Sequence, residues 1–165
     1  MSNLTFGVYE KYGASYKTMT LTDGEYALTI TPEKGGSAPI MDVIDYGEPV
    51  TTKGLNMLYG PGNDLVSATA LTAAGAHMVL FSTGRGTPFG APAPTLKIAT
   101  NSQLAEKKKT WIDFNAGVVA DGACTLDEAG ADLYRLVLEV ASGKKTKAEE
   151  KGFREISIFK DGVVL

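Results

Sequence analysis

The sequence has little of the chemistry that builds common metal sites or covalent cross-links. Its 165 residues include one cysteine and one histidine. One cysteine cannot form a disulfide within the chain, and these two residues are too few for a zinc site of the usual His/Cys types. Positive charge is not in excess either, because 16 lysines and arginines stand against 19 aspartates and glutamates. A net charge of −3 removes the usual electrostatic reason to expect a nucleic-acid partner.

Long hydrophobic runs are also missing. No apolar run approaches the roughly 18–20 residues that a membrane-spanning helix needs, so we expect no membrane partner. Residues 1–11 lack a basic region followed by an apolar core, so we expect no export signal and a cytoplasmic location. The length is that of one ordinary domain, and it allows a sizeable core without cross-links.

The first part of the chain differs in pattern from the rest. Residues 19–22 and 26–30 alternate apolar and polar side chains around Asp23-Gly24. Alternation around an Asp-Gly pair predicts a β-hairpin. Gly35 and Gly36 then interrupt the chain. We therefore expect a short N-terminal hairpin segment over residues 1–36 and a second domain over residues 37–165.

The second domain is predicted to alternate strands and helices. Short apolar runs predict strands at 55–59, 78–81 and 95–99, and the run 78–81 is of the kind buried on both faces of a sheet. Helices are expected at 39–46, at 65–74 with Asp64 as cap, at 103–109 with Asn101 or Ser102 as cap, and from the capping box Thr125–Glu128 to Gly143. We interpret 144–151 as a solvated linker and 156–165 as a last strand or hairpin. The fold class expected is α/β, a mainly parallel sheet with helices on both faces in Rossmann-like layers.

Two glycine-rich turns, at 60–64 and 83–88, follow predicted strands. Ligands of open α/β sheets bind outside the carboxyl ends of the strands. The first turn offers Asn63 and Asp64, and the second offers Thr83, Gly84, Arg85, Gly86 and Thr87. An arginine in such a loop can grip a carboxylate through two parallel hydrogen bonds. The alternative is two tight turns with a surface arginine. Neither turn is a known phosphate motif. The turn at 60–64 lacks the Gly-Lys-Ser/Thr of the Walker pattern, and in the second turn Phe89 stands where a third glycine is needed.

Further polar residues lie on or near the predicted strands. Lys97 is a charge within an apolar strand, either a buried base or a lysine on a partly exposed face. Asp113 and Asn115 share one face of an extended segment, where they either line a polar cleft or cap a turn. His77 and Cys124 have no partner in the sequence pattern, and we interpret both as structural.

Several motifs occur in an order and spacing typical of a known family. They are the segments 53–56, 60–64, 73–76, 81–88, 94–101, 111–117 and 153–160, with sequences KGLN, GPGND, AAGA, FSTGRGTP, PTLKIATN, WIDFNAG and FREISIFK. The chain resembles the C-terminal domain of the altronate/galactarate dehydratase family from about residue 34 to residue 165. Residues 1 to about 33 are not expected to resemble the family's preceding segment.

The resemblance implies removal of water from a hexonate such as D-altronate, giving a 2-keto-3-deoxy acid. It also implies a divalent metal, Fe²⁺ or Mn²⁺, although no metal ligands are identifiable in this chain. Catalytic residues stay unknown, with Lys97, Asp64 and Asp113 as candidates. The expected substrate-binding residues are Asn63, Asp64, Thr83, Gly84, Arg85, Gly86, Thr87, Lys97, Asn101 and Asn115.

The resemblance leaves more than one role open, because enzymes of the family are much longer than this chain. The chain is either the C-terminal domain or subunit of a sugar-acid dehydratase, or a truncated non-catalytic module that binds sugar acids or assists assembly. It is alternatively a fragment of a complete enzyme. The expected partners are a sugar acid, a separate N-terminal dehydratase chain and a second copy of the chain.

Overall fold

The computed structural model describes residues 5–8, 17–20, 39–60 and 62–158. The chain divides into two compact units, Met1–Ser37 and Ala38–Leu165. In the first unit, β1 (Thr5–Val8) pairs antiparallel with β2 (Lys17–Thr20). The predicted hairpin therefore overlaps β2 at residues 19 and 20. Its Asp23-Gly24 turn and its second strand, 26–30, lie outside the described residues.

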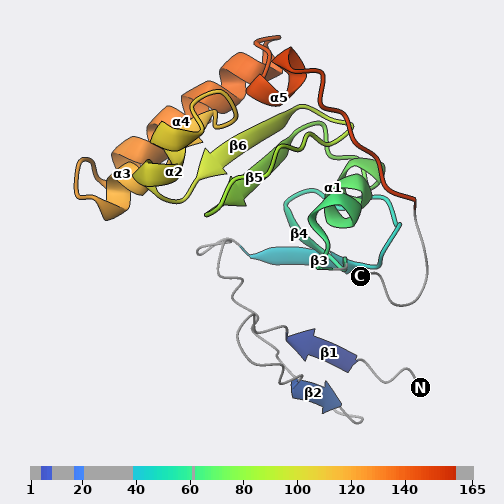
Figure 1. Ribbon diagram of the computed structural model, residues 1–165. Helices are drawn as coiled ribbons and strands as arrows, with labels where there is room; N and C mark the ends of the chain where they lie inside the picture. Colours follow the sequence, from blue (N-terminus) through green and yellow to red (C-terminus); the bar gives the residue numbers. More distant parts are fainter. Residues whose placement is uncertain (1–4, 9–16, 21–38, 61, 159–165) are drawn as a thin grey trace. The chain divides into compact units, whose positions relative to one another are not determined.

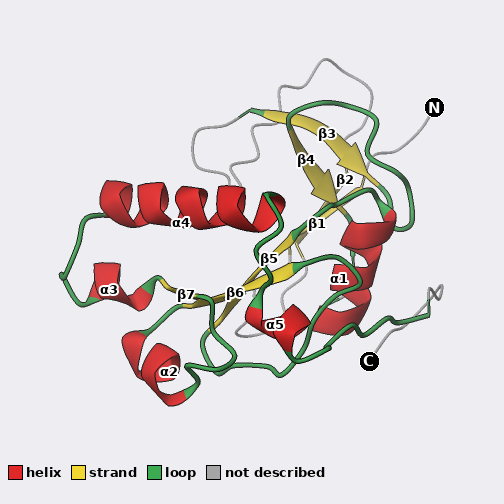
Figure 2. Ribbon diagram, turned by 90° about the horizontal axis from the view of Figure 1, so that it is seen from above, coloured by secondary structure: helices red, strands yellow, loops and turns green. Residues whose placement is uncertain are grey.

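The second unit contains two parallel sheets (Figure 1). One pairs β3 (Ile40–Ile44) with β4 (Leu55–Leu58), and the other has the order β5 (Val79–Thr83), β6 (Thr95–Ala99), β7 (Phe114–Asn115). The helices are α1 (Asp64–Ala73), α2 (Ser102–Lys107), α3 (Gly117–Ala120), α4 (Leu126–Ala141) and α5 (Lys147–Glu150). In Figure 2, α4 lies on one side of the three-stranded sheet, and α1, α2 and α5 lie on the other. The expected α/β class, with parallel strands and helices on both faces, is confirmed.

The middle strand, β6, carries the core of this unit. Four of its five residues are buried, and the predicted strand at 95–99 has the bounds of β6. On the side of α1, the buried residues are Ala68, Val79, Phe89 and Ala91; near α2 they are Ala99, Leu104 and Ile112. The edge strand β5 is less buried than expected, since Leu80 is 51% exposed. The expectation of burial on both faces fails for β5, because exposure alternates along the strand and the face that carries Leu80 is open.

Three segments differ from the sequence prediction. Residues 40–44 form a strand and not a helix, because β-branched Ile40, Val43 and Ile44 suit the parallel pairing with β4. The charged run 144–151 is not a linker, since it contains α5, which begins with a capping box of Thr146 and Glu149. Residues 153–158 are extended without forming a strand, while residues 159–165 lie outside the described part.

The helix starts follow the expected capping chemistry, with one shift. Asn63, not Asp64, caps α1, and its Oδ1 accepts hydrogen bonds from the backbone N–H groups of Leu65 (3.1 Å) and Val66 (3.3 Å). Asn101 caps α2, and the capping box of Thr125 and Glu128 begins α4. The apolar stripe of α4 turns Ala129 and Val140 into the core, but its first member, Leu126, is exposed.

A close backbone approach between the start of α2 and the first residue of α3 gives a test of this packing. A Cβ atom added at Gly117 lies 2.5 Å from the Cα of Asn101 and overlaps the backbone of Ser102 as well. We expect Gly117→Ala to lower the free energy of unfolding by about 3 kcal/mol, since backbone on both sides cannot yield. Gly130→Ala in α4 is the matched control, because no atom lies within 4 Å of the added carbon there. It should stabilise the chain by about 0.5–1 kcal/mol. Urea unfolding of both variants checks this, and equal effects would contradict it.

Candidate functional site

The carboxyl ends of three parallel strands meet at one edge of the second unit. β5, β6 and β7 end at Thr83, Ala99 and Asn115, beside α2 and α3 (Figure 1). We call the residues that follow these strand ends the carboxyl edge: 83–87, 100–102, 115–117 and Asp121. It is the position at which open parallel sheets usually bind ligands.

Hydrogen bonds within the loop after β5, and one from the segment that follows β6, hold this loop in place. The hydroxyl oxygen of Thr83 accepts from the backbone N–H groups of Arg85 (3.3 Å) and Gly86 (3.0 Å). The side-chain amide of Asn101 donates to the carbonyl of Gly84 at 3.1 Å. Gly86 adopts a φ of 82°, a conformation that favours glycine. The backbone around Arg85 is therefore held in one shape.

The side chain of Arg85 is exposed at this edge. Within the described residues, its guanidinium makes no hydrogen bond or ion pair. A guanidinium in this state has all five donors free for an anion, and its planar fork matches a carboxylate.

A second group of polar side chains joins β7 to α2. The hydroxyl of Ser102 accepts a hydrogen bond from the Asn115 amide (3.0 Å) and donates to the carboxylate of Asp121. The side-chain oxygen of Asn115 accepts from the N–H of Gly117 at 3.0 Å. Asp121 was not predicted from the sequence, because a single aspartate in a turn between two helices forms no recognisable motif. Ser102 was noticed only as a possible cap.

Lys97 lies in β6 on the face covered by α1, α2 and α5, and it is 1% exposed. Its ammonium donates to the backbone carbonyl of Thr87 and lies 5.9 Å and 5.7 Å from the ring centres of Phe81 and Phe89. Burial lowers the pKa of Lys97 from 10.5 to about 8, and the nearby carboxylates of Glu155 and Asp113 partly oppose this shift. Lys97 thus touches the loop that carries Arg85 through one backbone atom.

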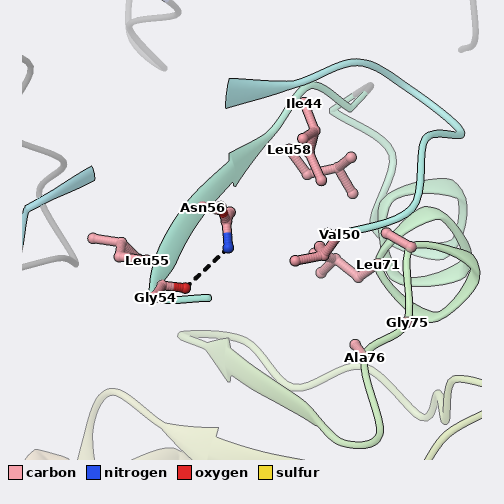
Figure 3. A pocket seen from close by; sticks show the side chains of 10 residues that line it. Ile44, Val50, Gly54, Leu55, Asn56, Leu58, Leu71, Gly75 and Ala76 are labelled. Carbon is pink, nitrogen blue, oxygen red and sulfur yellow. Dashed lines mark hydrogen bonds between the residues drawn. The ribbon is translucent and has the colours of Figure 1, made fainter. Parts of the chain in front are cut away.

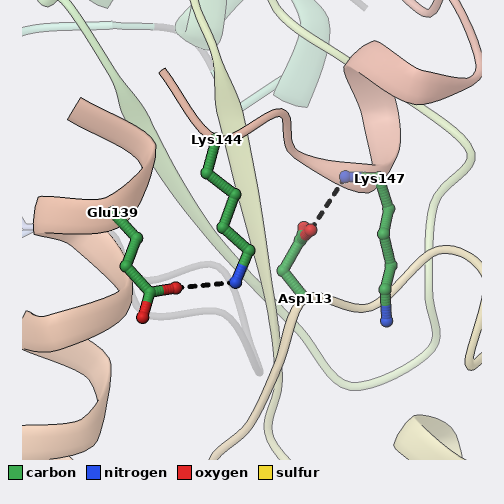
Figure 4. Close-up of polar contacts among 4 residues, drawn as sticks. All are labelled: Asp113, Glu139, Lys144 and Lys147. Carbon is green, nitrogen blue, oxygen red and sulfur yellow. Dashed lines mark hydrogen bonds and ion pairs between the residues drawn. The ribbon is translucent and has the colours of Figure 1, made fainter. Parts of the chain in front are cut away.

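Asp113 binds backbone groups with both of its carboxylate oxygens. One accepts from the N–H of Lys97 at 2.8 Å, and the other from the N–H of Lys147 at 2.9 Å (Figure 4). The Lys147 side chain donates to the carbonyls of Lys109 and Ile112. Asp113 therefore joins β6 to the start of α5 through backbone groups 16 and 34 positions away.

The remaining predicted site residues lie elsewhere. Asn63 and Asp64 begin α1, which both ribbon views show away from α2 and α3. Asn63 is used as a cap, and Asp64 is exposed. The structure thus brings together Thr83, Gly84, Arg85, Gly86, Asn101 and Asn115, connects Lys97 through Thr87, and leaves Asn63, Asp64 and Asp113 outside this group.

An open hollow of about 380 Å³ lies between β4 and α1 (Figure 3). Its lining is aliphatic apart from one amide, with Ile44, Val50, Leu55, Asn56, Leu58 and Leu71 among its residues. The amide of Asn56 donates to the carbonyls of Thr52 (2.9 Å) and Gly54 (3.0 Å), while its buried oxygen has no partner in the described chain. Without a charged side chain, this hollow is poorly suited to an organic anion.

Clustered metal ligands and long apolar helices are both missing from the described residues. No group of three or more His, Cys, Asp or Glu side chains comes together there as a metal site. These residues therefore do not fit a divalent metal by themselves. No helix in the described part of the chain is long and apolar enough to cross a membrane.

Asp113 gives a test with a built-in control. Asp113→Asn should lower the free energy of unfolding by about 1–3 kcal/mol, because an amide has one acceptor oxygen for two backbone donors. The control is Glu139→Gln, which removes an exposed ion pair. In this pair the Lys144 ammonium lies 2.6 Å from the Glu139 carboxylate (Figure 4). It should cost less than about 0.5 kcal/mol. Chemical denaturation compares the two, and an equal loss for both contradicts the bridging role of Asp113.

The pKa of Lys97 predicts a pH dependence of stability. Between about pH 8 and 10.5 the unfolded chain keeps the Lys97 proton that the folded chain has lost, so rising pH favours the folded state. The stability of the wild type relative to Lys97→Met should rise by up to about 1 kcal/mol per pH unit in this window. Urea unfolding at several pH values measures this difference. A difference that stays constant, or shrinks as pH rises, contradicts the lowered pKa.

Comparison with known proteins identifies the relatives of this chain. A sequence model of the family described as D-galactarate/Altronate dehydratase, C-terminal, matches residues 27–164. Altronate dehydratase of Escherichia coli (strain K12) is 48% identical over 158 residues, which are 96% of this chain and 32% of that protein. Altronate dehydratase of Bacillus subtilis (strain 168) is 47% identical over 88% of this chain and 29% of its own length. Galactarate dehydratase (L-threo-forming) of E. coli is 41% identical over 68% of this chain and 22% of its own.

These matches extend further toward the N-terminus than the motifs indicated. Coverage of 96% takes in most of residues 1–33, which we expected not to resemble the family. The chain spans about a third of the length of the altronate dehydratases that it matches. From the family match and the shared identity, the chain belongs to the D-galactarate/altronate dehydratase family and corresponds to its C-terminal domain.

Proposed function

We propose that this chain supplies the surface that binds the substrate carboxylate in a sugar-acid dehydratase, and that this surface is the carboxyl edge. The observation that carries the proposal is Arg85, whose backbone is held by Thr83 while its guanidinium is exposed and unpaired within the described residues. The names of the relatives support it, because altronate and galactarate are both sugar acids with a carboxylate.

The neighbouring groups suit the rest of such a substrate. Amide and hydroxyl side chains both donate and accept hydrogen bonds, as sugar hydroxyls require. Asn101, Ser102 and Asn115 supply these groups within the same edge. Asp121 is a carboxylate whose partner is a serine hydroxyl, so it also has acceptor capacity for a sugar hydroxyl. We propose these four residues as hydroxyl-binding groups beside Arg85.

In the proposed reaction, a base removes the proton next to the carboxylate, and an acid protonates the departing hydroxyl. Negative charge then grows on the carboxylate oxygens, and a fixed guanidinium there stabilises that charge more in the transition state than in the substrate. Arg85 would serve this step. We propose that an Fe²⁺ or Mn²⁺ ion, where the reaction uses one, is held by groups outside the described residues, and we derive no step through it.

A second candidate function is a binding or assembly module without catalysis of its own. Two observations favour it over turnover by this chain alone. The carboxyl edge holds no histidine or lysine ready to act as a base, since Lys97 is buried against Thr87. The chain also spans only about a third of the altronate dehydratases. A chain carrying the remaining parts of a dehydratase, or a second copy, is the proposed partner.

Binding of D-altronate tests the role of Arg85. We expect Arg85→Ala to weaken binding at least tenfold in calorimetric titration, because a bidentate charged hydrogen bond is lost. Arg85→Lys should recover part of the affinity, since lysine keeps the charge but not the fork. The matched control is Arg135→Ala, which removes an exposed arginine paired with Asp132 in α4. No binding by the wild type, or equal loss in both alanine variants, overturns the proposal.

Turnover separates the two candidate functions. D-altronate and galactarate are incubated with the chain and Fe²⁺ or Mn²⁺, with and without a chain supplying the rest of a dehydratase. Formation of a 2-keto-3-deoxy acid that depends on Arg85 supports the catalytic role. Binding without product under all these conditions supports the non-catalytic module.

A further inference from the structure

Hydrogen bonds hold the loop between β5 and β6 at both of its ends. At its start, the Thr83 hydroxyl holds the N–H groups of Arg85 and Gly86. Near its end, Gly90 and Glu155 exchange two hydrogen bonds: the N–H of Glu155 donates to the Gly90 carbonyl at 2.7 Å, and the Gly90 N–H donates to the Glu155 carboxylate at 2.8 Å. Between these ends, Phe89 is buried in the core and its N–H donates to the Thr87 carbonyl at 2.9 Å, and one further contact reaches the same carbonyl.

That contact is the hydrogen bond from the Lys97 ammonium to the carbonyl of Thr87, two residues beyond Arg85. Lys97 reaches it from the middle of β6, between the rings of Phe81 and Phe89. With a side chain 1% exposed, Lys97 has almost no water to replace this acceptor. The position of the ammonium and the position of the loop are thus coupled.

The charged groups around Lys97 are two carboxylates. Asp113 acts from the segment before β7, and Glu155 acts from the extended segment after α5. Neither lies within ion-pair distance of the ammonium in the described structure. Both favour the charged form, but desolvation by burial outweighs them and lowers the pKa of Lys97 to about 8. The ammonium is therefore mostly protonated at neutral pH and loses its proton in mildly alkaline solution.

We propose that Lys97 is a positioning residue for the carboxylate site: its ammonium holds the Thr87 carbonyl, and with it the loop that presents Arg85, so that removing this donor loosens the loop and weakens sugar-acid binding. This inference rests on the proposed function in its last step, the binding of a carboxylate by Arg85. A charged donor makes a hydrogen bond about twice as strong as a neutral one, so a side chain without a donor leaves the loop less firmly held.

Hydrogen exchange tests the hold on the loop without any ligand. Protection of the amides at 85–89, corrected for intrinsic rates, should fall about tenfold in Lys97→Met at neutral pH. Lys144→Met, which removes an exposed lysine, is the control and should follow the wild type. Amides of α4 report whether the whole fold is affected. Equal loop protection in Lys97→Met and the wild type overturns the inference.

Calorimetric titration with D-altronate tests the consequence for binding. At neutral pH Lys97→Met should bind about fivefold more weakly than the wild type, because it has no donor for the Thr87 carbonyl. Lys97→Arg, which keeps a charged donor, should bind well.

The two experiments distinguish the two ways of failing. If the wild type binds no sugar acid at any pH, the proposed function is contradicted. If the wild type binds through Arg85 but Lys97→Met binds as tightly as the wild type, the positioning role of Lys97 is contradicted while the proposed function stands. Should Lys97→Arg not fold, the comparison of Lys97→Met with Lys144→Met still decides the outcome.

Discussion

The arrangement around the three-stranded sheet depends on a buried lysine in its middle strand. An ammonium removed from water needs hydrogen-bond acceptors, and a single long side chain can recruit them from segments far apart in the sequence. Lys97 finds its acceptor in the loop after β5, while its own backbone N–H binds Asp113, and Glu155 lies close enough to favour its charge. Asp113 and Glu155 in turn hold α5 and the loop end at Gly90. One buried cation and two carboxylates thus organise the face opposite α4.

Much of the fold could be predicted from the sequence because its signals are local. The apolar run 95–99, the cap at Asn101 and the capping box at Thr125 each depend on neighbours within a few residues, and the structure has a strand and two helices there. The segment 40–44 was misassigned because an early proline and a late glycine also fit a helix, and only pairing with β4 decides for a strand. The helix at 147–150 was not predicted because its charged residues resemble a solvated linker. Its capping box begins at Thr146, which is buried.

The site was predictable in part for the same reason. Glycines and an arginine directly after an apolar run indicate the carboxyl edge, and the bonds among Thr83, Gly84 and Asn101 agree with that pattern. The roles of Asp113 and Asp121 depend on contacts with residues 34 and 19 positions away, which no local pattern records. From the sequence alone, a carboxylate that binds two backbone N–H groups cannot be distinguished from one that binds a substrate.

Local charge, more than net charge, determines which ligand this edge can attract. The whole chain carries −3, yet charges beyond roughly 8 Å are largely screened at physiological salt. Near Arg85, an atom added at Gly86 would lie 3.8 Å from the side chain of Lys108, whose ammonium lies 4.3 Å from the centre of the Trp111 ring. Asp121 is the opposing charge of this edge, and the Ser102 hydroxyl already donates to it. The edge therefore offers an anion the exposed guanidinium of Arg85, with amide and hydroxyl groups nearby that suit the hydroxyls of a sugar acid.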